Sequence, residues 1–461
     1  MLKTLKNAWR IPELRSKLLF TMLIIVLYRL GANIPVPYVN PELISSFSDS
    51  FDGSIFQFLN ILSGNALGQA TLFALGVSPY ITSSIVVQLL TVALPPLERL
   101  AKQGEEGRKK ITAITRLVTV GLALITAIGY AFYLNNYGLL LKDLTFFSGA
   151  IIVACYCAGA ALVMWLAEKL NESGIGNGIS IILFANIVAS LPGIAATIWN
   201  TIFAKGAAPS GASPIMSNFT WYGLANALFE ALFLIALVFI IVWMSDAERR
   251  IPIQYAKRVV GRKMYGGQGT NLPLKMNMAG VMPIIFSSSI VSVPLMIAGF
   301  FPNSGFATFI TKWFGYDSFP YLLIYTVLLF AFAFFYVAIS FNPVEVANNI
   351  KNNGGAIPGI RVGRPTVVYI KKILNRVTLL GVIILALIAC VPMLITAIDA
   401  HIFDSEMAGL KAVFGWVHGK LDFSALSFGG SSLIIVVGVA LETVRELEAQ
   451  MSLRNYKGFL D

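Results

Sequence analysis

The chain has 461 residues, of which 57% are hydrophobic and only 12% are charged. Soluble domains carry about 25% charged residues, so this composition excludes an ordinary soluble protein and indicates that lipid surrounds most of the chain. The net charge of +11 would also suit a nucleic-acid-binding protein. However, the basic residues stand between apolar stretches, so we interpret them as a topology signal and as attraction to anionic lipids.

Ten apolar stretches of roughly 20 residues, the length that a helix needs to cross a bilayer core about 30 Å thick, follow one another along the chain. The tenth is the weakest, because its first half is small and polar and suits a protein interior better than lipid. We predict an all-α membrane protein with ten transmembrane helices. The predicted spans are Leu18–Asn33, Gly76–Leu94, Leu117–Tyr137, Ser148–Ala167, Ile179–Trp199, Tyr222–Met244, Gly280–Phe300, Pro320–Phe341, Val377–Ile398 and Ala425–Val444.

The distribution of basic residues predicts the orientation, because short loops rich in Lys and Arg stay in the cytoplasm. With ten spans and both termini inside, all but six of the 34 basic residues fall on the cytoplasmic side or next to it. We therefore expect a multi-pass protein of the cell membrane with both termini in the cytoplasm. The basic loops 98–116, 246–275 and 342–376 exceed what topology needs, and they would form a docking platform for a large cytoplasmic partner.

Residues for catalysis, redox chemistry or metal binding are scarce. Two glycine-rich stretches, 174–178 and 266–269, lack the Lys-Ser/Thr ending of a phosphate-binding loop. His401 and His418 are the only histidines, and the three cysteines lie within predicted spans. We expect no catalytic residue, no metal site, no cofactor and no disulfide, so any energy must come from a partner or from the membrane potential.

The ten spans divide into two halves of five. Because five is odd, the second half enters the membrane from the opposite side, which would give an inverted repeat with a pathway at its interface. We divide the chain into residues 1–245, which hold the first five spans and, from about residue 222, the sixth span that begins the second half, and residues 246–461. The second segment holds the basic loop 246–278, the last four spans and the cytoplasmic tail.

Glu230 supports an alternative function, a ten-helix secondary transporter, because ion-coupled carriers keep ionisable residues near the membrane midplane. The possible inverted repeat is compatible with that alternative. The other interpretation of Glu230 is that the sixth helix starts later than predicted and leaves this carboxylate near the outer surface or paired with a neighbour. Apart from it, we find within the predicted spans Arg29 and Glu442, the latter close to the inner end of the last span.

Seven motifs, in order along nearly the whole chain, resemble those of the SecY family, whose members are channel subunits of protein translocases. The longest is the stretch 75–90, which is similar to the second helix of that family. The motifs are YRLG at 28–31 with IPVP at 34–37, LGVSPYITSSIVVQLL at 75–90, GIGNGIS at 174–180, AERRIP at 247–252 with YAKR at 255–258, LPLK at 272–275 with NMAGV at 277–281, PGIR at 358–361 and YKGFL at 456–460.

The resemblance implies two pseudo-symmetric five-helix halves that form a clamshell around a central pore, with a ring of aliphatic side chains at its constriction. Residues 81 and 85, like 183 and 187, are four apart and so share one helix face. Leucine at position 183 departs from the usual isoleucine. Such a ring could fit around a passing peptide while gating ions by dewetting. The implied ring is Ile81, Ile85, Leu183, Ile187, Ile285 and Ile435.

The stretch 54–69 is moderately apolar but too short to span the membrane before Gly76. The resemblance implies a plug, a short helix that closes the external funnel and moves aside on a glycine-bearing hinge. A plain re-entrant or interfacial segment is the alternative. The implied plug residues are Phe56, Phe58, Leu59, Ile61, Leu62, Gly64 and Asn65.

The resemblance also implies a lateral gate between the second and seventh helices, through which apolar segments leave for the lipid. Polar groups there could bond across the closed seam and reset when a signal sequence intercalates, although buried polar groups in membrane helices often only tie neighbours together. The implied gate residues are Thr82, Ser84, Gln88, Asn277 and Ser288.

Arg361 lies between two glycines of a basic loop and matches the family arginine on which the motor ATPase SecA and the ribosome dock. The implied partners are SecE, SecG, SecA, the ribosome, signal-bearing preproteins and anionic lipids, with no nucleic acid except ribosomal RNA contacts. An accessory family member with restricted substrates stays an alternative to the general channel. The implied docking residues are Arg249, Arg250, Lys257, Arg258, Arg361 and Tyr456.

Overall fold

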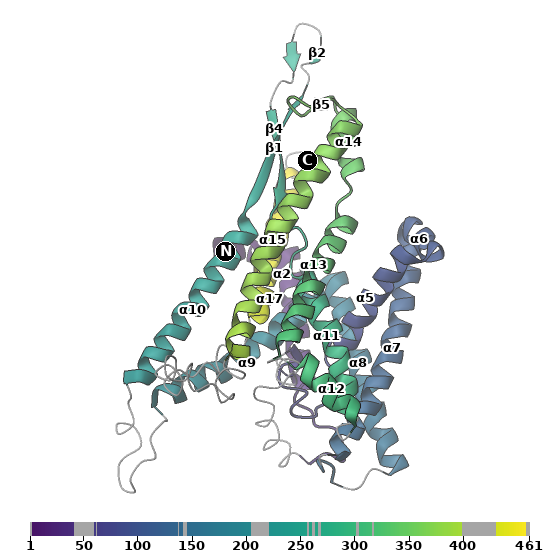
Figure 1. The fold of residues 1–461 in the computed structure, drawn as a ribbon. Coiled ribbons are helices and arrows are strands. Elements are labelled where there is room, and N and C mark those ends of the chain that lie inside the picture. Colours follow the sequence, from purple (N-terminus) through teal and green to yellow (C-terminus); the bar gives the residue numbers. More distant parts are fainter. Residues whose placement is uncertain are drawn as a thin grey trace.

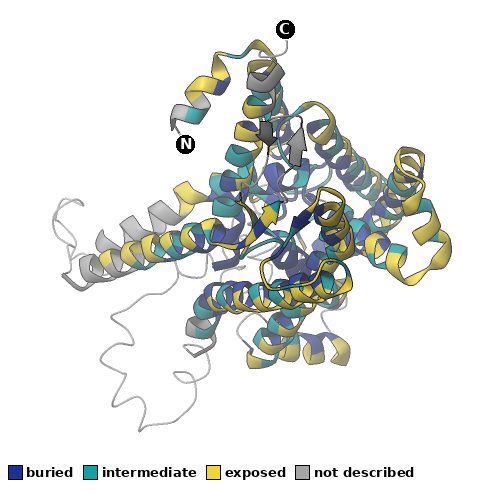
Figure 2. Cartoon of the chain, turned by 90° about the horizontal axis from the view of Figure 1, so that it is seen from above, coloured by how far each residue is buried: buried dark blue, intermediate teal, exposed yellow. Residues whose placement is uncertain are grey.

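The computed structural model describes residues 2–457 except 41–59, 61, 137, 142–144, 204–220, 256–257, 261–262, 266–268, 301–303, 316–317 and 399–429. Its long helices form a bundle, and a β-hairpin extends from one end (Figure 1). Buried residues gather toward the centre of the bundle, and exposed residues lie on the outside (Figure 2).

Proline starts several helices in the first half of the chain, because it fixes φ and lacks only an N–H that would be unpaired there. It also ends α5: Leu94 is extended before Pro95, and the next helix leaves at 99°. The helices of this half are α1 (Leu2–Trp9), α2 (Pro12–Gly31), α5 (Ser78–Ala93), α6 (Pro95–Lys102), α7 (Glu105–Asn136), α8 (Phe146–Ser173) and α9 (Gly178–Phe203).

The second half of the chain adds the remaining helices, several of which extend beyond the apolar stretches that the sequence shows. The helix predicted from Val377 begins at Arg364, because its first turns continue out of the apolar region as an amphipathic helix. The helices are α10 (Trp221–Asp246), α11 (Met282–Phe300), α12 (Gly305–Phe314), α13 (Phe319–Ser340), α14 (Pro343–Asn352), α15 (Arg364–Ile398) and α17 (Gly430–Lys457).

The described part of each of the ten predicted spans falls on a helix, and α1, α6, α12 and α14 are further helices outside these spans. Within the described residues, four helices are long and apolar enough to cross a membrane, or five if the bent pair α5 and α6 is one span. The count of ten spans therefore stays a prediction. The late start proposed for the sixth helix is wrong: α10 begins at Trp221, so Glu230 lies inside the helix.

Two of the basic loops form one sheet at the hairpin end of the molecule. β1 (Glu248–Tyr255) pairs antiparallel with β4 (Gly269–Lys275) on one edge and with β5 (Gly355–Ala356) on the other. The short strands β2 (Arg258–Val260) and β3 (Lys263–Tyr265) pair beyond them. Residues of both loops share a small apolar core, so the two loops pack together as one unit. This core includes Ile251, Ile253, Leu274, Ile350, Ile357 and Ile370.

Candidate functional site

The six residues of the implied ring converge in the interior from four helices. Ile81 and Ile85 lie on α5, Leu183 and Ile187 on α9, and the other two on α11 and α17. Each is at most 4% exposed, and all six belong to one hydrophobic cluster. α11 packs against both α5 and α17, and α17 packs against α9. An aliphatic centre built this way offers a passing ion no polar partner.

The start of α9 shows why the glycine motif at 174–180 is needed. The Asn177 side chain caps the helix by accepting the Ile179 N–H at 3.0 Å, and the Gly178 N–H donates to the Asn171 side chain at 2.7 Å. A Cβ on Gly178 would lie 2.1 Å from the Ala167 carbonyl oxygen of α8. Only glycine therefore lets α9 begin this close to α8, and this contact sets the position of the α9 ring residues.

Of the implied plug, Phe56, Phe58, Leu59 and Ile61 lie outside the described residues. Leu62 is partly buried against the cluster that contains the ring. Gly64 and Asn65 both have φ of +69°, a left-handed conformation that these two residue types tolerate best. The chain therefore turns sharply within the predicted plug segment, next to Leu62, which packs against the ring cluster.

Two side chains hold this turn, the fully buried Asn186 and the partly buried Arg29. The Asn186 amide of α9 donates to the Leu62 carbonyl at 2.7 Å and to the Tyr28 hydroxyl at 2.9 Å. The Arg29 guanidinium of α2 donates to the Gly64 carbonyl at 3.3 Å and to the Ala185 carbonyl at 2.5 Å. We call Tyr28, Arg29 and Asn186 the polar clamp, since they fasten residues 62–64 to α2 and α9.

The polar clamp is the feature that sequence reasoning missed. Arg29 stood out as a charge in the first span, but its partners are backbone carbonyls, which carry no sequence signal. Asn186 is one of two amides in the apolar helix α9, and its partner Leu62 lies 124 positions away. The available clue in the sequence was an Asn between two implied ring positions, 183 and 187.

Tyrosines continue the attachment downstream of the turn. The Tyr130 hydroxyl of α7 donates to the Leu67 carbonyl at 2.5 Å, and the Tyr156 hydroxyl of α8 donates to the Ala70 carbonyl at 3.3 Å. Residues 62–70 are thus bonded to four helices of the first half, so the described part of this segment has a fixed place in the bundle.

The implied gate residues bond within their own helices. The Thr82 hydroxyl donates to the Ser78 carbonyl, the Gln88 amide donates to Ser84, and the Ser288 hydroxyl donates to the Ile285 carbonyl. This differs from the expected bonds across the seam. The reason is geometric: a hydroxyl in a helix reaches the carbonyl three or four residues back without any partner helix.

Asn277 lies at the junction between β4 and α11. Its Oδ1 is buried and has no hydrogen-bond partner. It lines a small cavity together with Val337 of α13 and with Thr378 and Gly381 of α15. The structure therefore places Asn277 between the basic hairpin and the second half of the bundle.

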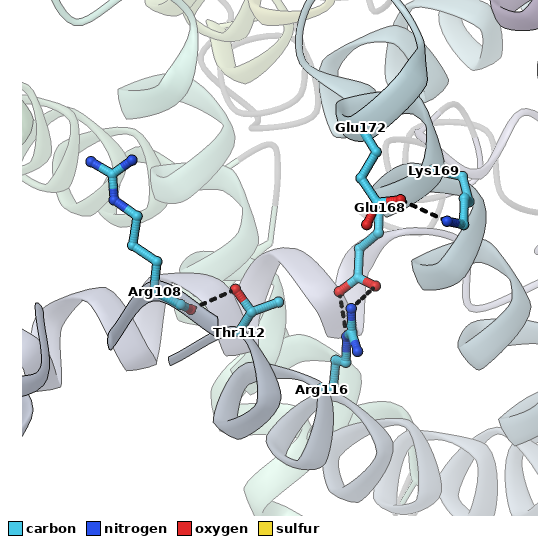
Figure 3. Close-up of polar contacts among 6 residues, drawn as sticks. All are labelled: Arg108, Thr112, Arg116, Glu168, Lys169 and Glu172. Atoms are coloured by element: carbon cyan, nitrogen blue, oxygen red, sulfur yellow. Dashed lines mark hydrogen bonds and ion pairs between the residues drawn. The ribbon is translucent and has the colours of Figure 1, made fainter. Parts of the chain in front are cut away.

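On the first-half side of the seam, the helices are joined to each other by polar contacts. Ser83 of α5 and Thr119 of α7 share a hydrogen bond of 2.5 Å. Arg116 of α7 also makes a two-pronged ion pair with Glu168 of α8, at 2.9 and 2.8 Å (Figure 3). Such bidentate pairs fix orientation as well as distance.

The implied docking residues lie at the hairpin end. Arg249 and Arg250 are exposed on β1, and Arg250 pairs with Glu248 at 2.6 Å. Arg361 is exposed in the loop after β5, between Gly359 and Gly363, which have φ of +80° and +105°. Lys257 lies outside the described residues. Arg258 and Tyr456 have a described backbone, in β2 and in the last turn of α17.

The third basic loop carries partly compensated charge. Lys102 of α6 bonds to Glu98 at 2.5 Å, and this hydrogen bond lowers the pKa of the Glu98 carboxyl. In the part of the chain that the structure describes, no group of three His, Cys, Asp or Glu side chains could hold a metal ion.

A family model described as SecY matches residues 71–444. Full-length relatives include the protein translocase subunits SecY of Streptomyces coelicolor, 42% identical, and of Mycobacterium tuberculosis, 40% identical; each match covers 100% of both chains.

Solved structures share the fold at low identity. One, described as the structure of a protein conducting channel, gives a TM-score of 0.61 at 17% identity, with 96% of each chain covered. Sec61 in a canine ribosome-channel complex from the endoplasmic reticulum gives 0.57 at 15% identity, again with 96% of each chain covered.

Proposed function

Because this chain belongs to the SecY family, it is a protein translocase channel subunit, and we propose that it conducts unfolded preproteins across the cell membrane and releases transmembrane segments sideways into lipid. The observation that carries the proposal is the convergence of six buried aliphatic residues from α5, α9, α11 and α17. Side chains of this kind part around a peptide and close again without binding ions.

We propose that residues 54–69 are the plug and that the polar clamp fastens its downstream end. The support is the position of Leu62 against the ring cluster and the bonds from Asn186 and Arg29 to the carbonyls of residues 62 and 64. In this arrangement the ring and the plug close the same passage in series.

The lateral gate is proposed between α5 with α7 on one side and α11 with α13 on the other. α11 packs against α5 and α7. The self-bonded hydroxyls of Thr82, Ser287 and Ser288 make separation of these helices possible without breaking a hydrogen bond. A signal sequence would take the place of α11 against α5.

The sheet at the hairpin end is the proposed docking platform. Arg249, Arg250 and Arg361 are exposed there, and a shared apolar core joins the two loops that carry them. We assign this end to the cytoplasm, together with both termini, and we propose SecA and the ribosome as its partners. SecE and SecG are proposed as the accompanying subunits. We assign the chain itself no catalytic role.

The test is reconstitution. The chain is purified with SecE, placed in liposomes, and supplied with SecA, ATP and a signal-bearing preprotein. The proposal expects ATP-dependent protection of the preprotein from added protease, and none when the signal sequence is removed. If the preprotein is not protected although the complex is folded and inserted, the general channel function is refuted. Protection limited to a few preproteins would favour the accessory family member.

A further inference from the structure

α12 presents three different faces, of which the first is packed and the second is an exposed aromatic stripe. Ala307 and Ile310 are only 4% and 6% exposed and belong to the central cluster with residues of α11 and α13. In contrast, Phe306, Phe309 and Trp313 are 50%, 56% and 47% exposed. Because positions three, four and seven apart share one side of a helix, these three rings form a single outward stripe.

The third face is polar. Thr308 and Lys312 are both exposed and stand four residues apart. At about 100° per residue, they lie almost opposite the packed residues Ala307 and Ile310, and the aromatic stripe lies between the two. The order around the helix is therefore core, aromatic, polar. This is the order of faces expected of a helix that lies at the boundary between lipid and water and packs with one side against a protein.

The direction of the stripe is fixed by the neighbouring elements. Ser304 caps the start of α12 by accepting the Ala307 N–H at 3.1 Å. At the other end, the Ser318 hydroxyl lies 2.7 Å from the Gly315 carbonyl and 3.1 Å from that of Trp313, and it accepts the Tyr321 N–H of α13 at 3.4 Å. One buried serine thus joins the end of α12 to the start of α13.

The exposed surface of α13 indicates what covers the stripe. Leu323 and Val327 are exposed on this helix, which is long and apolar enough to cross a membrane, so they face lipid. α12 packs against α13 at the end of the bundle away from the hairpin (Figure 1). The aromatic stripe is therefore placed where the lipid-facing surface meets the headgroups, the depth at which aromatic rings and lysines gather.

We propose that α12 is an interfacial helix: the rings of Phe306, Phe309 and Trp313 lie at the boundary between headgroups and acyl chains, and Lys312 reaches the lipid phosphates. Because α12 is bonded to α13 and packed on α11, it sets the membrane depth of both helices. The inference requires only that the chain spans a membrane, so it stands or falls separately from the proposed channel function.

The experiment compares two neighbouring positions in the full chain. Cys155, Cys157 and Cys390 are replaced by Ala, and a single cysteine is introduced as Phe309→Cys or, as the matched control, Thr308→Cys. Each is labelled with an environment-sensitive fluorophore and reconstituted in phosphatidylethanolamine and phosphatidylglycerol vesicles. Quenching is measured with nitroxide attached to acyl carbon five of the lipid and, separately, with aqueous iodide.

We expect nitroxide lipid to quench the label at 309 at least about twofold more than the label at 308, and iodide to show the reverse, since interfacial helices bury their apolar face about 5–10 Å deep. Strong iodide quenching at 309 would overturn the proposal. Protection of 309 from both quenchers would also overturn it, in favour of cover by a second copy of the chain. Phe306→Cys on the same stripe serves if Phe309→Cys does not fold.

Discussion

Asn186 shows how much one amide can hold in an apolar interior. Its side chain is fully buried, and its NH2 group binds both the Leu62 carbonyl and the Tyr28 hydroxyl, while its Oδ1 has no partner. Because Asn186 is 0% exposed, bulk solvent does not reach those bonds. Gly64 shares the same space, because a Cβ there would lie 2.7 Å from the Arg29 guanidinium and 2.8 Å from Asn186 Oδ1.

Asn186→Ala should loosen the turn after residue 62. Leaving the Leu62 carbonyl unpaired costs about 1–3 kcal/mol, so we expect faster hydrogen exchange at the amides of Asn65 and Leu67 and a lower thermal unfolding midpoint. The matched control is Asn33→Ala, since Asn33 is exposed and bonds only within its own helix region. Equal effects of the two substitutions would contradict a specific role for Asn186.

Arg361→Glu should abolish motor-driven translocation while the protein still inserts. Reversing this exposed charge turns an attraction for an acidic partner surface into repulsion without touching the apolar core. The readout is preprotein translocation with SecA in liposomes, together with SecA binding. Arg364→Glu is the control, because Arg364 is equally basic and exposed but begins a helix, where a carboxylate is well tolerated. Full activity of Arg361→Glu would refute the assignment.

Among the elements, the segment that leads to the turn at Gly64 and Asn65 is the one proposed to close the channel. Deleting residues 56–65 should raise the resting ion conductance of the reconstituted channel, because the ring would then be the sole barrier. The measurement is single-channel current in planar bilayers without preprotein. Removing residues 404–413 instead is the control for a shortened chain. Unchanged conductance after the 56–65 deletion would count against a plug.

The seam between α5 and α11 has to part if segments leave sideways. We expect a short bifunctional thiol reagent that joins Ser84→Cys to Ser288→Cys to block transport, and reduction of a cleavable version to restore it. The background lacks Cys155, Cys157 and Cys390, and each single variant treated with the same reagent is the control. Undiminished transport by the fully crosslinked protein would mean that the seam stays closed in the cycle.

The sequence predicted helices well where a long apolar stretch marks them, and less well where helices are short or polar. α7 and α8 carry long apolar stretches and were found with displaced ends, since their polar first or last turns look like loops. α12 has only ten residues, too few for a search based on spanning length. Ile251, Pro252 and Ile253 do alternate in burial, but this signal is too short to predict β1 among so many charges.

On the scale of the whole molecule, charge asymmetry makes the orientation testable. Cysteine at Thr270, on the hairpin, should react with an impermeant maleimide only after the cells are opened. Cysteine at Thr308, on α12, should react in intact spheroplasts. The two positions lie at opposite ends of the bundle (Figure 1), and the cysteine-free chain is the control. The reverse pattern would invert the topology.

The sequence predicted which residues belong to the candidate site, but it did not predict how the segments that carry them contact one another. The ring rested on motif resemblance, and its residues do lie in one buried cluster; its role in gating stays a prediction. The junction of two basic loops through β5 could not be foreseen, because Gly355 and Ala356 pair with Tyr255 and Gln254 a hundred residues earlier. Contacts between backbones so far apart leave little trace in side-chain pattern.

The hydroxyls of the seam have one further consequence. On α11, Ser287, Ser288 and Ser292 all donate to carbonyls of their own helix, whereas the polar bond of Ser83 runs to α7 on the same side. When a segment enters between α5 and α11, the apolar contacts between these helices are therefore replaced by apolar contacts with the segment. The hydroxyls named here form no hydrogen bond that would favour one entering sequence over another. Entry at the seam would then depend on the summed hydrophobicity of a segment and not on its particular residues. Segments of unrelated sequence but equal hydrophobicity could therefore enter equally well.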